Sequence, residues 1–289
     1  MEFYHLRSFV IVAKTGNLTA AAKQLCSPPP AISAHIKSLE EELKTNLFIR
    51  SSKGMSLTSQ GELLLNKAEA TLNSAIDMVN LAAENQNEII GDYKLSINQQ
   101  PPQLKLTNLY QNISENCQGI SLSVSTRSTG KAIEEIQNKI IDGGYVYGNV
   151  PEDLFAIKIK KQNITTIIPF SSKLNENTTI IELTSQPWIK MGAFCPFDEA
   201  LKNKLPNHNL ANINTSDDDT RLSLVTSGCG ISFLETEVAL QAASKRQVNI
   251  LQQLDFVIDL IFVVHKNRMN EPVIKAIIEE IKILWDIRS

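Results

Sequence analysis

The sequence is poor in the residues that would mark a disulfide, metal or catalytic site. Cysteine occurs four times in 289 residues, and positions 26, 117, 195 and 229 are too scattered for a disulfide framework or a zinc site. The four histidines, at positions 5, 35, 208 and 265, form no spaced pair. The segment Gly228-Cys229-Gly230 lacks the lysine and glycine pattern that completes a phosphate loop. We therefore expect no enzymatic activity, no metal and no cofactor.

Long apolar runs and an export signal are also missing. Residues 1–14 form an amphipathic pattern that charged residues interrupt, and no segment approaches the roughly 18 apolar residues of a membrane span. We therefore expect a cytoplasmic protein that does not enter a membrane. Hydrophobic residues make up 43% of the chain, and its length suggests about two domains.

The segment of residues 15–50 predicts two short helices joined by a tight turn. Alanines at positions 20–22 would let the first helix pack closely across the second. The second has apolar residues at spacings of four, three and four, so that one face carries Ile32, Ile36, Leu39 and Leu43. The opposite face is small, polar or basic and carries Ser33, Ala34, His35, Lys37 and Ser38. Such a face suits a DNA groove, although an ordinary pair of helices would show the same pattern.

A longer pattern within residues 1–61 is more specific than this periodicity. It consists of Leu6, Phe9, Ala13, Gly16, Ala21, Ala22, Leu25, Pro30, Ala31, Ser33, Ile36, Leu39, Glu40, Leu43, Leu47, Phe48, Arg50, Leu57, Thr58 and Gly61. These residues, in this order, resemble the N-terminal pattern of LysR-type transcriptional regulators. The resemblance is sharp up to Gly61, looser beyond it, and extends over the whole chain.

The resemblance implies an α+β multidomain regulator of bacterial transcription. Residues 1–61 would form a winged helix-turn-helix, residues 62–90 a coiled-coil-like linker helix for dimerisation, and residues 91–289 a two-lobed α/β regulatory domain. The regulatory domain would resemble the periplasmic binding protein fold, with lobe I at about 91–160 and 266–289 and lobe II at about 161–265. Such a protein binds an interrupted palindrome in double-stranded DNA as a dimer or homotetramer. It responds to a small effector in the cleft between the lobes, and an anion is one candidate for this effector.

The same resemblance implies which residues contact DNA. On the second helix they are Pro29, Pro30, Ser33, Ala34, His35 and Lys37, and on the wing they are Arg50 and Lys53. Residues 48–58 predict the wing as a hairpin with a polar tip. An ion pair of Arg50 with Glu40 or Glu41 is an alternative of nearly equal weight.

Prolines at positions 28–30 are the main departure from the family pattern. Ser27 is a candidate cap, and because a residue before proline avoids the α region, the helix is expected to start near Pro30. The family commonly has Ser and Gln where Pro28 and Pro29 stand. We therefore expect a different base preference, with apolar contacts to thymine methyl groups replacing polar ones.

Charge and periodicity agree with this division of the chain. The net charge is −3, but residues 1–61 hold seven Lys and Arg against four acids, and residues 62–90 hold one Lys against five acids. The excess in the first segment is small enough to arise by chance. Residues 59–87 predict one helix with a heptad seam, which indicates helix-to-helix dimerisation rather than a lone amphipathic helix. The seam consists of Leu65, Ala68, Leu72, Ala75, Val79 and Ala82.

Alternating strand and helix patterns after Gly91 predict a parallel α/β sheet. Strands are expected at 93–98, 120–125, 143–147, 157–160, 164–168, 231–234 and 255–265, with the chain crossing between lobes at 157–168. Helices are expected at 104–116, 131–141, after Pro196, within 215–228 and at 271–287. Acids at 217–219 suit the start of a helix better than a metal site.

The effector site is expected where strand ends meet helix starts. Arg127, Ser128 and Thr129 follow a strand and precede a helix, a position that suits an anion or carboxylate. A simple helix cap by Ser128 or Thr129 is at least as probable for either residue alone. By resemblance, the same cleft receives Gln99, Gln100 and Phe194, and it is narrowed by Tyr145 and Tyr147.

Two other functions remain possible on the sequence. Cys195 stands near the reactive cysteine of peroxide-sensing relatives, so a thiol-based oxidant sensor is an alternative. No neighbouring base or nearby second cysteine is evident, which favours a small buried residue instead. A solute-binding protein without catalysis would explain the second half but would leave residues 1–91 without a role.

Overall fold

The computed structural model describes residues 2–51, 54–82, 89–192, 195–215 and 217–287. They form two compact units, Met1–Gly91 and Asp92–Ser289, and each is described by itself. Within the described residues, no helix combines the length and the apolar character needed to cross a bilayer.

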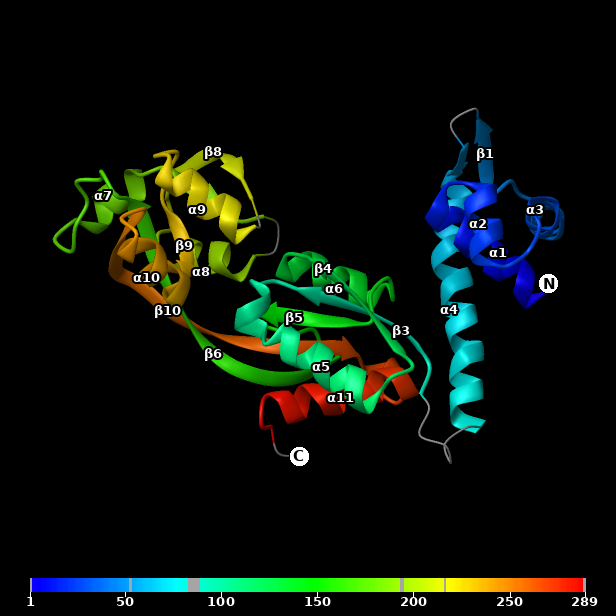
Figure 1. Ribbon diagram of the computed structural model, residues 1–289. Helices are drawn as coiled ribbons and strands as arrows, with labels where there is room; N and C mark the ends of the chain where they lie inside the picture. The colour runs from blue at the N-terminus through cyan, green and yellow to red at the C-terminus, as the bar shows by residue number, and fades with distance from the viewer. Residues whose placement is uncertain (1, 52–53, 83–88, 193–194, 216, 288–289) are drawn as a thin grey trace. The chain divides into compact units, whose positions relative to one another are not determined.

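The first unit is helical with one hairpin (Figure 1). Its elements are α1 (Phe3–Thr15), α2 (Leu18–Gln24), α3 (Pro29–Leu43), β1 (Phe48–Ser51), β2 (Gly54–Leu57) and α4 (Ser59–Ala82). Gly16 ends α1 in the left-handed region at φ 63°, which a glycine adopts without strain. Asn17 then caps α2, and its side chain accepts hydrogen bonds from the backbone N–H groups of Thr19 (2.8 Å) and Ala20 (3.1 Å). Neighbouring residues thus encode the turn between the first two helices.

The start of α3 differs from the prediction by one residue. Pro28 is the extended N-cap, and Pro29 is already helical. Ser27 does not cap the helix, because its hydroxyl donates to the carbonyl of Leu25 at 3.1 Å. Proline suits the first helical position because its fixed φ is helical and the N–H that it lacks would have no partner there.

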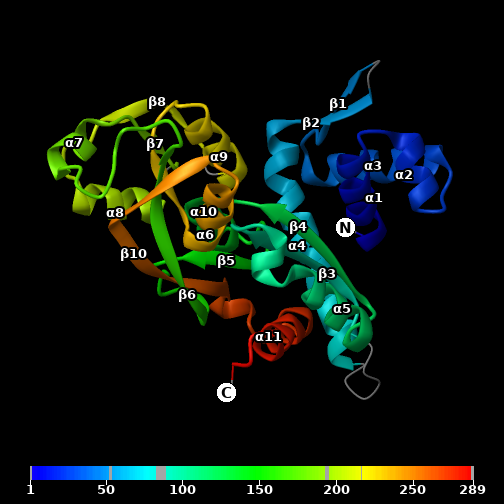
Figure 2. The same ribbon diagram turned by 60° about the vertical axis from the view of Figure 1, so that its left-hand side comes forward.

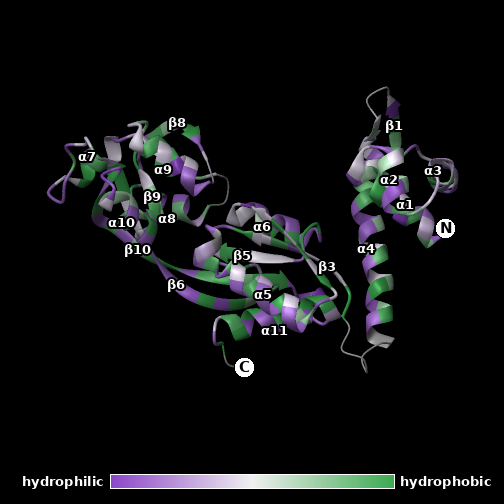
Figure 3. Cartoon of the chain, viewed as in Figure 1, coloured by the Kyte–Doolittle hydropathy of each residue, from purple (hydrophilic) through white to green (hydrophobic). Residues whose placement is uncertain are grey.

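One apolar core joins the elements of the first unit. Its buried residues are Leu6, Phe9, Val10, Val12, Ala21, Ala22, Ile32, Ile36, Leu39, Leu47, Phe48 and Ala68. Leu65 and Leu72 of α4 pack against this core. The first half of the predicted heptad seam therefore also covers the core of its own unit, and its role in dimerisation stays a prediction. Farther along α4, Val79 remains 60% exposed and Met78 68% exposed, and apolar and polar residues mix along this helix (Figure 3).

The second unit is built on a six-stranded sheet in the order β4-β3-β5-β10-β6-β9. The strands are β3 (Gly91–Ile97), β4 (Ile120–Thr126), β5 (Gly143–Tyr147), β6 (Leu154–Pro169), β9 (Ser232–Glu235) and β10 (Val248–His265). β3 and β5 are parallel, but β10 is antiparallel to both β5 and β6, and β6 is antiparallel to β9. The expected all-parallel sheet is therefore wrong, and the sheet is mixed. The two short strands expected at 157–168 are parts of the single strand β6.

The long pair β6 and β10 runs through both halves of this unit (Figure 2). At one end its residues join a core with Ala132, Ile136 and Val146, and at the other end they join a core with Ile189, Val225 and Leu234. We call these halves the first lobe and the second lobe.

Helices cover the sheet in both lobes. In the first lobe they are α5 (Leu106–Asn116), α6 (Thr129–Gln137) and α11 (Pro272–Leu284), with short 3-10 turns η1 (Pro101–Leu104) and η2 (Lys266–Arg268). In the second lobe they are α7 (Ile180–Ser185), α8 (Pro196–Lys204), α9 (Asp218–Thr226) and α10 (Thr236–Ser244), beside the parallel pair β7 (Trp188–Lys190) and β8 (Leu210–Asn214). The sequence patterns did not predict α7 or α10 as separate helices.

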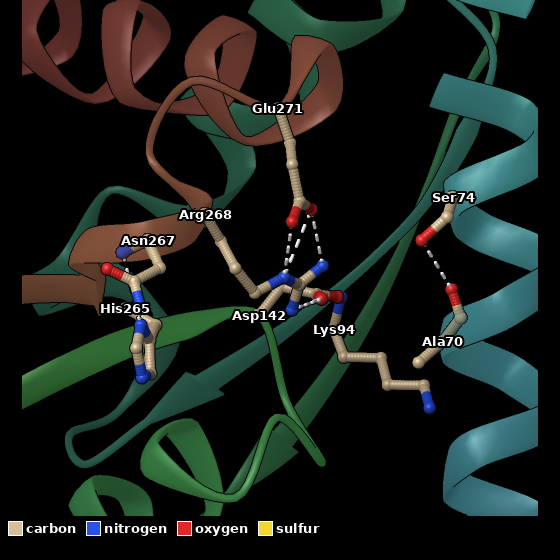
Figure 4. Close-up of polar contacts among 8 residues, drawn as sticks. All are labelled: Ala70, Ser74, Lys94, Asp142, His265, Asn267, Arg268 and Glu271. Carbon is tan, nitrogen blue, oxygen red and sulfur yellow. Dashed lines mark hydrogen bonds and ion pairs between the residues drawn. The ribbon is translucent and has the colours of Figure 1, made fainter. Parts of the chain in front are cut away.

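A cluster of ionic side chains joins the start of α11 to the sheet (Figure 4). The guanidinium of Arg268 donates to Asp142 (2.7 Å) and in a forked arrangement to Glu271 (2.7–3.0 Å). The other oxygen of Asp142 accepts the backbone N–H of Lys94 at 2.7 Å. Asp142 is only 6% exposed, so Arg268 is its main charge compensation.

Replacement of Arg268 should destabilise the second unit strongly. In Arg268→Met, Asp142 stays buried without its ion pair, and we expect a loss of about 3 kcal/mol in the free energy of unfolding. Urea unfolding of the full chain measures this loss. The double variant Arg268→Met with Asp142→Asn should recover much of this loss. By contrast, Lys282→Met, which removes the partly exposed pair with Glu279, should cost less than about 1 kcal/mol. Equal losses for Arg268→Met and Lys282→Met would contradict this account.

Candidate DNA-binding surface and effector site

The exposed face of α3 carries most of the residues predicted to contact DNA. Pro29, Pro30, Ala34 and Lys37 are exposed, and Ser33 is half-buried. The ammonium group of Lys37 lies 3.6 Å from Glu41, one turn along the helix, and both side chains remain largely in solvent. The structure therefore brings these residues together on one accessible surface.

His35 differs from these residues because its half-buried ring contacts α1. Its Nδ1 lies 2.8 Å from the hydroxyl of Ser8, and its ring contacts those of Tyr4 and His5 on α1, with centroids 4.9 and 5.3 Å away. Burial, together with the neighbouring His5, lowers the pKa of His35 below its ordinary value, which favours the neutral ring. The side chain of His35 therefore takes part in packing α1 against α3, and its contact with DNA stays a prediction.

The wing has the predicted form of a hairpin. Phe48 pairs with Leu57 and Arg50 with Met55, and the backbone N–H of Met55 donates to the carbonyl of Gly16 at 2.8 Å. Arg50 is exposed and forms no ion pair with any described residue.

The alternative pairing of Arg50 with Glu40 is not formed. Glu40 instead accepts the backbone N–H groups of Leu47 (2.7 Å) and Phe48 (3.2 Å), which fixes the start of the wing. Lys53, the other predicted wing contact, lies outside the described residues.

Three helices of the second unit begin around one small hollow of about 30 Å³, which we call the chamber. The first lobe contributes the start of α6, and the second lobe contributes the starts of α8 and α9. The chamber is lined by Asn98, Arg127, Ser128, Thr129, Tyr147, Met191, Cys195, Phe197, Asp218 and Arg221. Helix starts carry partial positive charge and free N–H groups, so their convergence favours a negatively charged group.

The predicted residues Arg127, Ser128 and Thr129 line this chamber. The Nε of Arg127 donates to Glu135 at 3.0 Å, and its Nη1 donates to its neighbour's carbonyl at 2.9 Å. Ser128 caps α6, and the hydroxyl of Thr129 accepts the backbone N–H of Tyr147 at 3.1 Å. Ser128 therefore caps its helix and, like Arg127 and Thr129, also lines the chamber.

The other predicted effector residues have different positions. Gln99 is buried and donates to the hydroxyl of Tyr147, and Gln100 donates to Asp219 of the second lobe at 2.5 Å. Tyr145 is fully buried against Phe262, and its hydroxyl accepts the indole N–H of Trp285 at 3.4 Å. The prediction that Tyr145 faces the cleft is therefore wrong. Phe194 lies outside the described residues.

One charged contact that the sequence did not reveal lies at the chamber. Arg221, only 2% exposed, donates from Nη2 to Asp218, which lies at the start of α9. Asp217 is the helix cap expected from the acidic run, because it accepts the N–H of Thr220 at 2.8 Å. Asp218 has the additional role of pairing with the buried arginine. Nothing in the local pattern distinguished these neighbouring acids.

Behind Tyr147 lies a buried carboxyl group that connects the two lobes. The hydroxyl of Tyr147 in the first lobe donates to Glu235 in the second. Glu235 is 2% exposed, and burial, reinforced by the charge of Asp218, raises its pKa to about 7. Burial also raises the pKa of Asp218. Asp218 is paired with Arg221, whereas one oxygen of the buried Glu235 has no partner among the described residues.

Cys195 is a half-buried residue directly before α8. Burial raises the pKa of its thiol, so the reactive thiolate is disfavoured at neutral pH. Among the described residues, no group of three or more His, Cys, Asp or Glu side chains could hold a metal.

A helix-turn-helix with a wing, a long connecting helix and a two-lobed α/β unit define the class of DNA-binding transcriptional regulators with an effector-binding domain. Residues 3–62 match the lysR family of bacterial regulatory helix-turn-helix proteins, and residues 87–285 match the LysR substrate binding domain. The chain therefore belongs to the LysR family of transcriptional regulators, which are not enzymes.

Similar proteins agree with this assignment. The chain is 27% identical to the HTH-type transcriptional regulator YofA of Bacillus velezensis over 240 residues, which are 81% of each chain. It is 26% identical to the regulator CzcR of Bacillus anthracis over 239 residues, 81% of this chain and 80% of that protein. Its fold resembles a full-length OxyR variant from Pseudomonas aeruginosa (TM-score 0.69, 18% identity, 98% and 95% of the two chains) and the LysR family regulator CbnR (TM-score 0.65, 18% identity, 99% of both chains).

The raised pKa of Glu235 should be visible in the pH dependence of stability. Between about pH 4.5, its ordinary pKa, and about pH 7, the folded state binds this proton more tightly than the unfolded state. The free energy of unfolding should therefore fall as pH rises through this window, by about 3 kcal/mol from this group. Urea unfolding at pH 5 to 8 should show a smaller fall for Glu235→Gln than for the wild type. The exposed Glu237→Gln should keep the wild-type dependence, and identical curves for Glu235→Gln and the wild type would show that the group titrates normally.

Proposed function

We propose that this regulator binds an interrupted palindrome through the exposed face of α3 and the wing, and that a small anionic effector occupies the chamber. The convergence of three helix starts on the chamber is the observation that carries the effector part. The effector would contact both lobes, so its binding would favour one relative arrangement of the lobes over others. That arrangement would in turn change the spacing of DNA-binding units in an assembly of subunits.

Base readout by α3 would differ from that of a helix with polar residues at its start. Pro29, Pro30 and Ala34 are exposed and apolar, so they suit contacts with thymine methyl groups. Lys37 on α3 and Arg50 on the wing would contact phosphates, which position the protein without reading sequence. CbnR, whose fold this chain shares, has been crystallised in complex with its target DNA (TM-score 0.63, 18% identity, 98% and 99% of the chains).

Dimerisation would use the part of α4 that the core of the first unit leaves exposed. The exposed apolar side chains on this helix are Leu63, Ile76, Met78 and Val79. Exposed apolar residues on a long helix favour association with a second copy, and a dimer would match the two half-sites of a palindrome. Two dimers would join through the regulatory domains to form a homotetramer.

The first experiment is fluorescence anisotropy with the DNA upstream of the protein's own gene and with scrambled DNA over a salt series. Lys37→Ala and Arg50→Ala should each weaken binding and flatten the slope of log affinity against log salt by about one unit, because each removes one phosphate contact. Lys245→Ala, an exposed lysine of the second unit, is the control and should leave the slope unchanged. An unchanged slope in both test variants would refute the assigned phosphate contacts, and equal binding to both DNAs would show that base readout is lost.

Charges on the exposed part of α4 should break the proposed dimer. The double variant Met78→Glu and Val79→Glu places two carboxylates where the second helix would pack, so sedimentation at micromolar concentration should show a smaller assembly than the wild type. Ile181→Glu on α7, where the isoleucine is 83% exposed, is the matched control and should sediment like the wild type. An unchanged assembly in the double variant would place the interface elsewhere.

A further inference from the structure

The chamber contains buried polar atoms that no described residue satisfies. The side-chain amide of Asn98 has neither a donor for its Oδ1 nor an acceptor for its Nδ2, and the Nε of Arg221 also lacks an acceptor. Such groups are costly when they are buried and unpaired, and they are usually satisfied by water or a ligand. The chamber therefore presents two free donors and one free acceptor to whatever occupies it.

Charges of both signs lie at the same place. Arg221 and Arg127 line the chamber, and so does the carboxylate of Asp218. One oxygen of Glu235, behind Tyr147, is also buried without a partner. A ligand with only a carboxylate would satisfy Nε of Arg221 and the helix starts, but it would offer no hydrogen to Oδ1 of Asn98. It would also bring another negative charge close to Asp218.

The size of the chamber limits its occupant further. A cavity needs a volume of about 10–15 Å³ to hold one buried water, and the volume of the chamber is about 30 Å³. It therefore has room for a small polar head group and not for a long chain.

We propose that the effector is a small α-amino acid in its zwitterionic form. Its carboxylate would lie at the helix starts beside Arg221, and its ammonium group would donate to Oδ1 of Asn98 and to Asp218. The ammonium group would satisfy the free acceptor and compensate the buried carboxylates, which a simple anion cannot do. This inference rests on the proposed function of the chamber as the effector site.

Calorimetric titration of the full-length protein tests this assignment with glycine, L-alanine and L-serine. Three analogues of alanine serve as matched probes: propionate lacks the ammonium group, lactate replaces it with a hydroxyl, and ethylamine lacks the carboxylate. We expect at least one of the three amino acids to bind. If L-alanine binds, its affinity should be at least tenfold higher than that of each analogue. For glycine the corresponding probes are acetate and methylamine. For serine they are 3-hydroxypropionate and ethanolamine.

The variant Asn98→Leu separates binding from folding. Leucine has a similar size and no polar atoms, and Asn98 has no partner to lose, so the melting temperature without ligand should stay equal or rise. Amino-acid binding should weaken at least tenfold. The control Asn108→Leu, at an exposed position of α5, should bind as the wild type does.

The outcomes distinguish this inference from the function on which it rests. If carboxylates bind as tightly as amino acids, the zwitterion is refuted while the anionic effector site stands. If no probe binds although DNA binding is sequence-specific, the amino acid is refuted and water fills the chamber. Unchanged amino-acid binding in Asn98→Leu would place the ligand outside the chamber and would refute the assignment as well.

Discussion

The antiparallel pairing of β6 and β10 is the constraint on which the regulatory unit depends. From His265 beside Leu154 to Val248 beside Pro169, these strands remain paired through the first lobe into the second, with two shifts of register. Each end of the pair is covered by its own apolar core. Because hydrogen-bonded strands connect the cores, the lobes are held side by side while their helix starts stay near one another. The chamber exists because this pairing brings α6 of one lobe against α8 and α9 of the other.

Electrostatic balance at the chamber is incomplete within the protein itself. Arg221 pairs with Asp218, and Arg127 pairs with Glu135, so both guanidinium groups already have carboxylate partners. Glu235 has only neutral hydrogen-bonding partners in Tyr147 and its surroundings, and its pKa is raised to about 7. Buried acceptors that lack a donor favour an occupant that brings a hydrogen-bond donor and a positive charge.

In the first unit, a single helix serves two purposes along its length. The beginning of α4 contributes Leu65, Ala68 and Leu72 to the core of the DNA-binding unit, and its later part presents Met78 and Val79 to solvent. This division explains why one continuous heptad pattern is a poor guide to a dimer interface. The same apolar spacing satisfies packing against three short helices or against a second long helix, and periodicity does not distinguish the two partners.

Much of the local structure was determined by the sequence alone. The Gly16–Asn17 turn, the apolar face of α3, the hairpin wing and the strand-to-helix turn at Arg127 to Thr129 all follow from neighbouring residues, whose conformational preferences act over a few positions. The family pattern in residues 1–61 likewise needed no tertiary information.

Only the tertiary structure decided which side chains meet. It turned His35 toward α1, placed Tyr145 in the core and paired Tyr147 with Glu235, 88 residues away. It also buried Arg221 against Asp218. Asp218 belongs to an acidic run that the sequence alone explains as helix capping. These contacts depend on the packing of segments that are distant in the chain, and periodicity within one segment contains no information about its partner. The sequence therefore determined the class of protein and its local elements, while tertiary packing decided which side chains line the chamber.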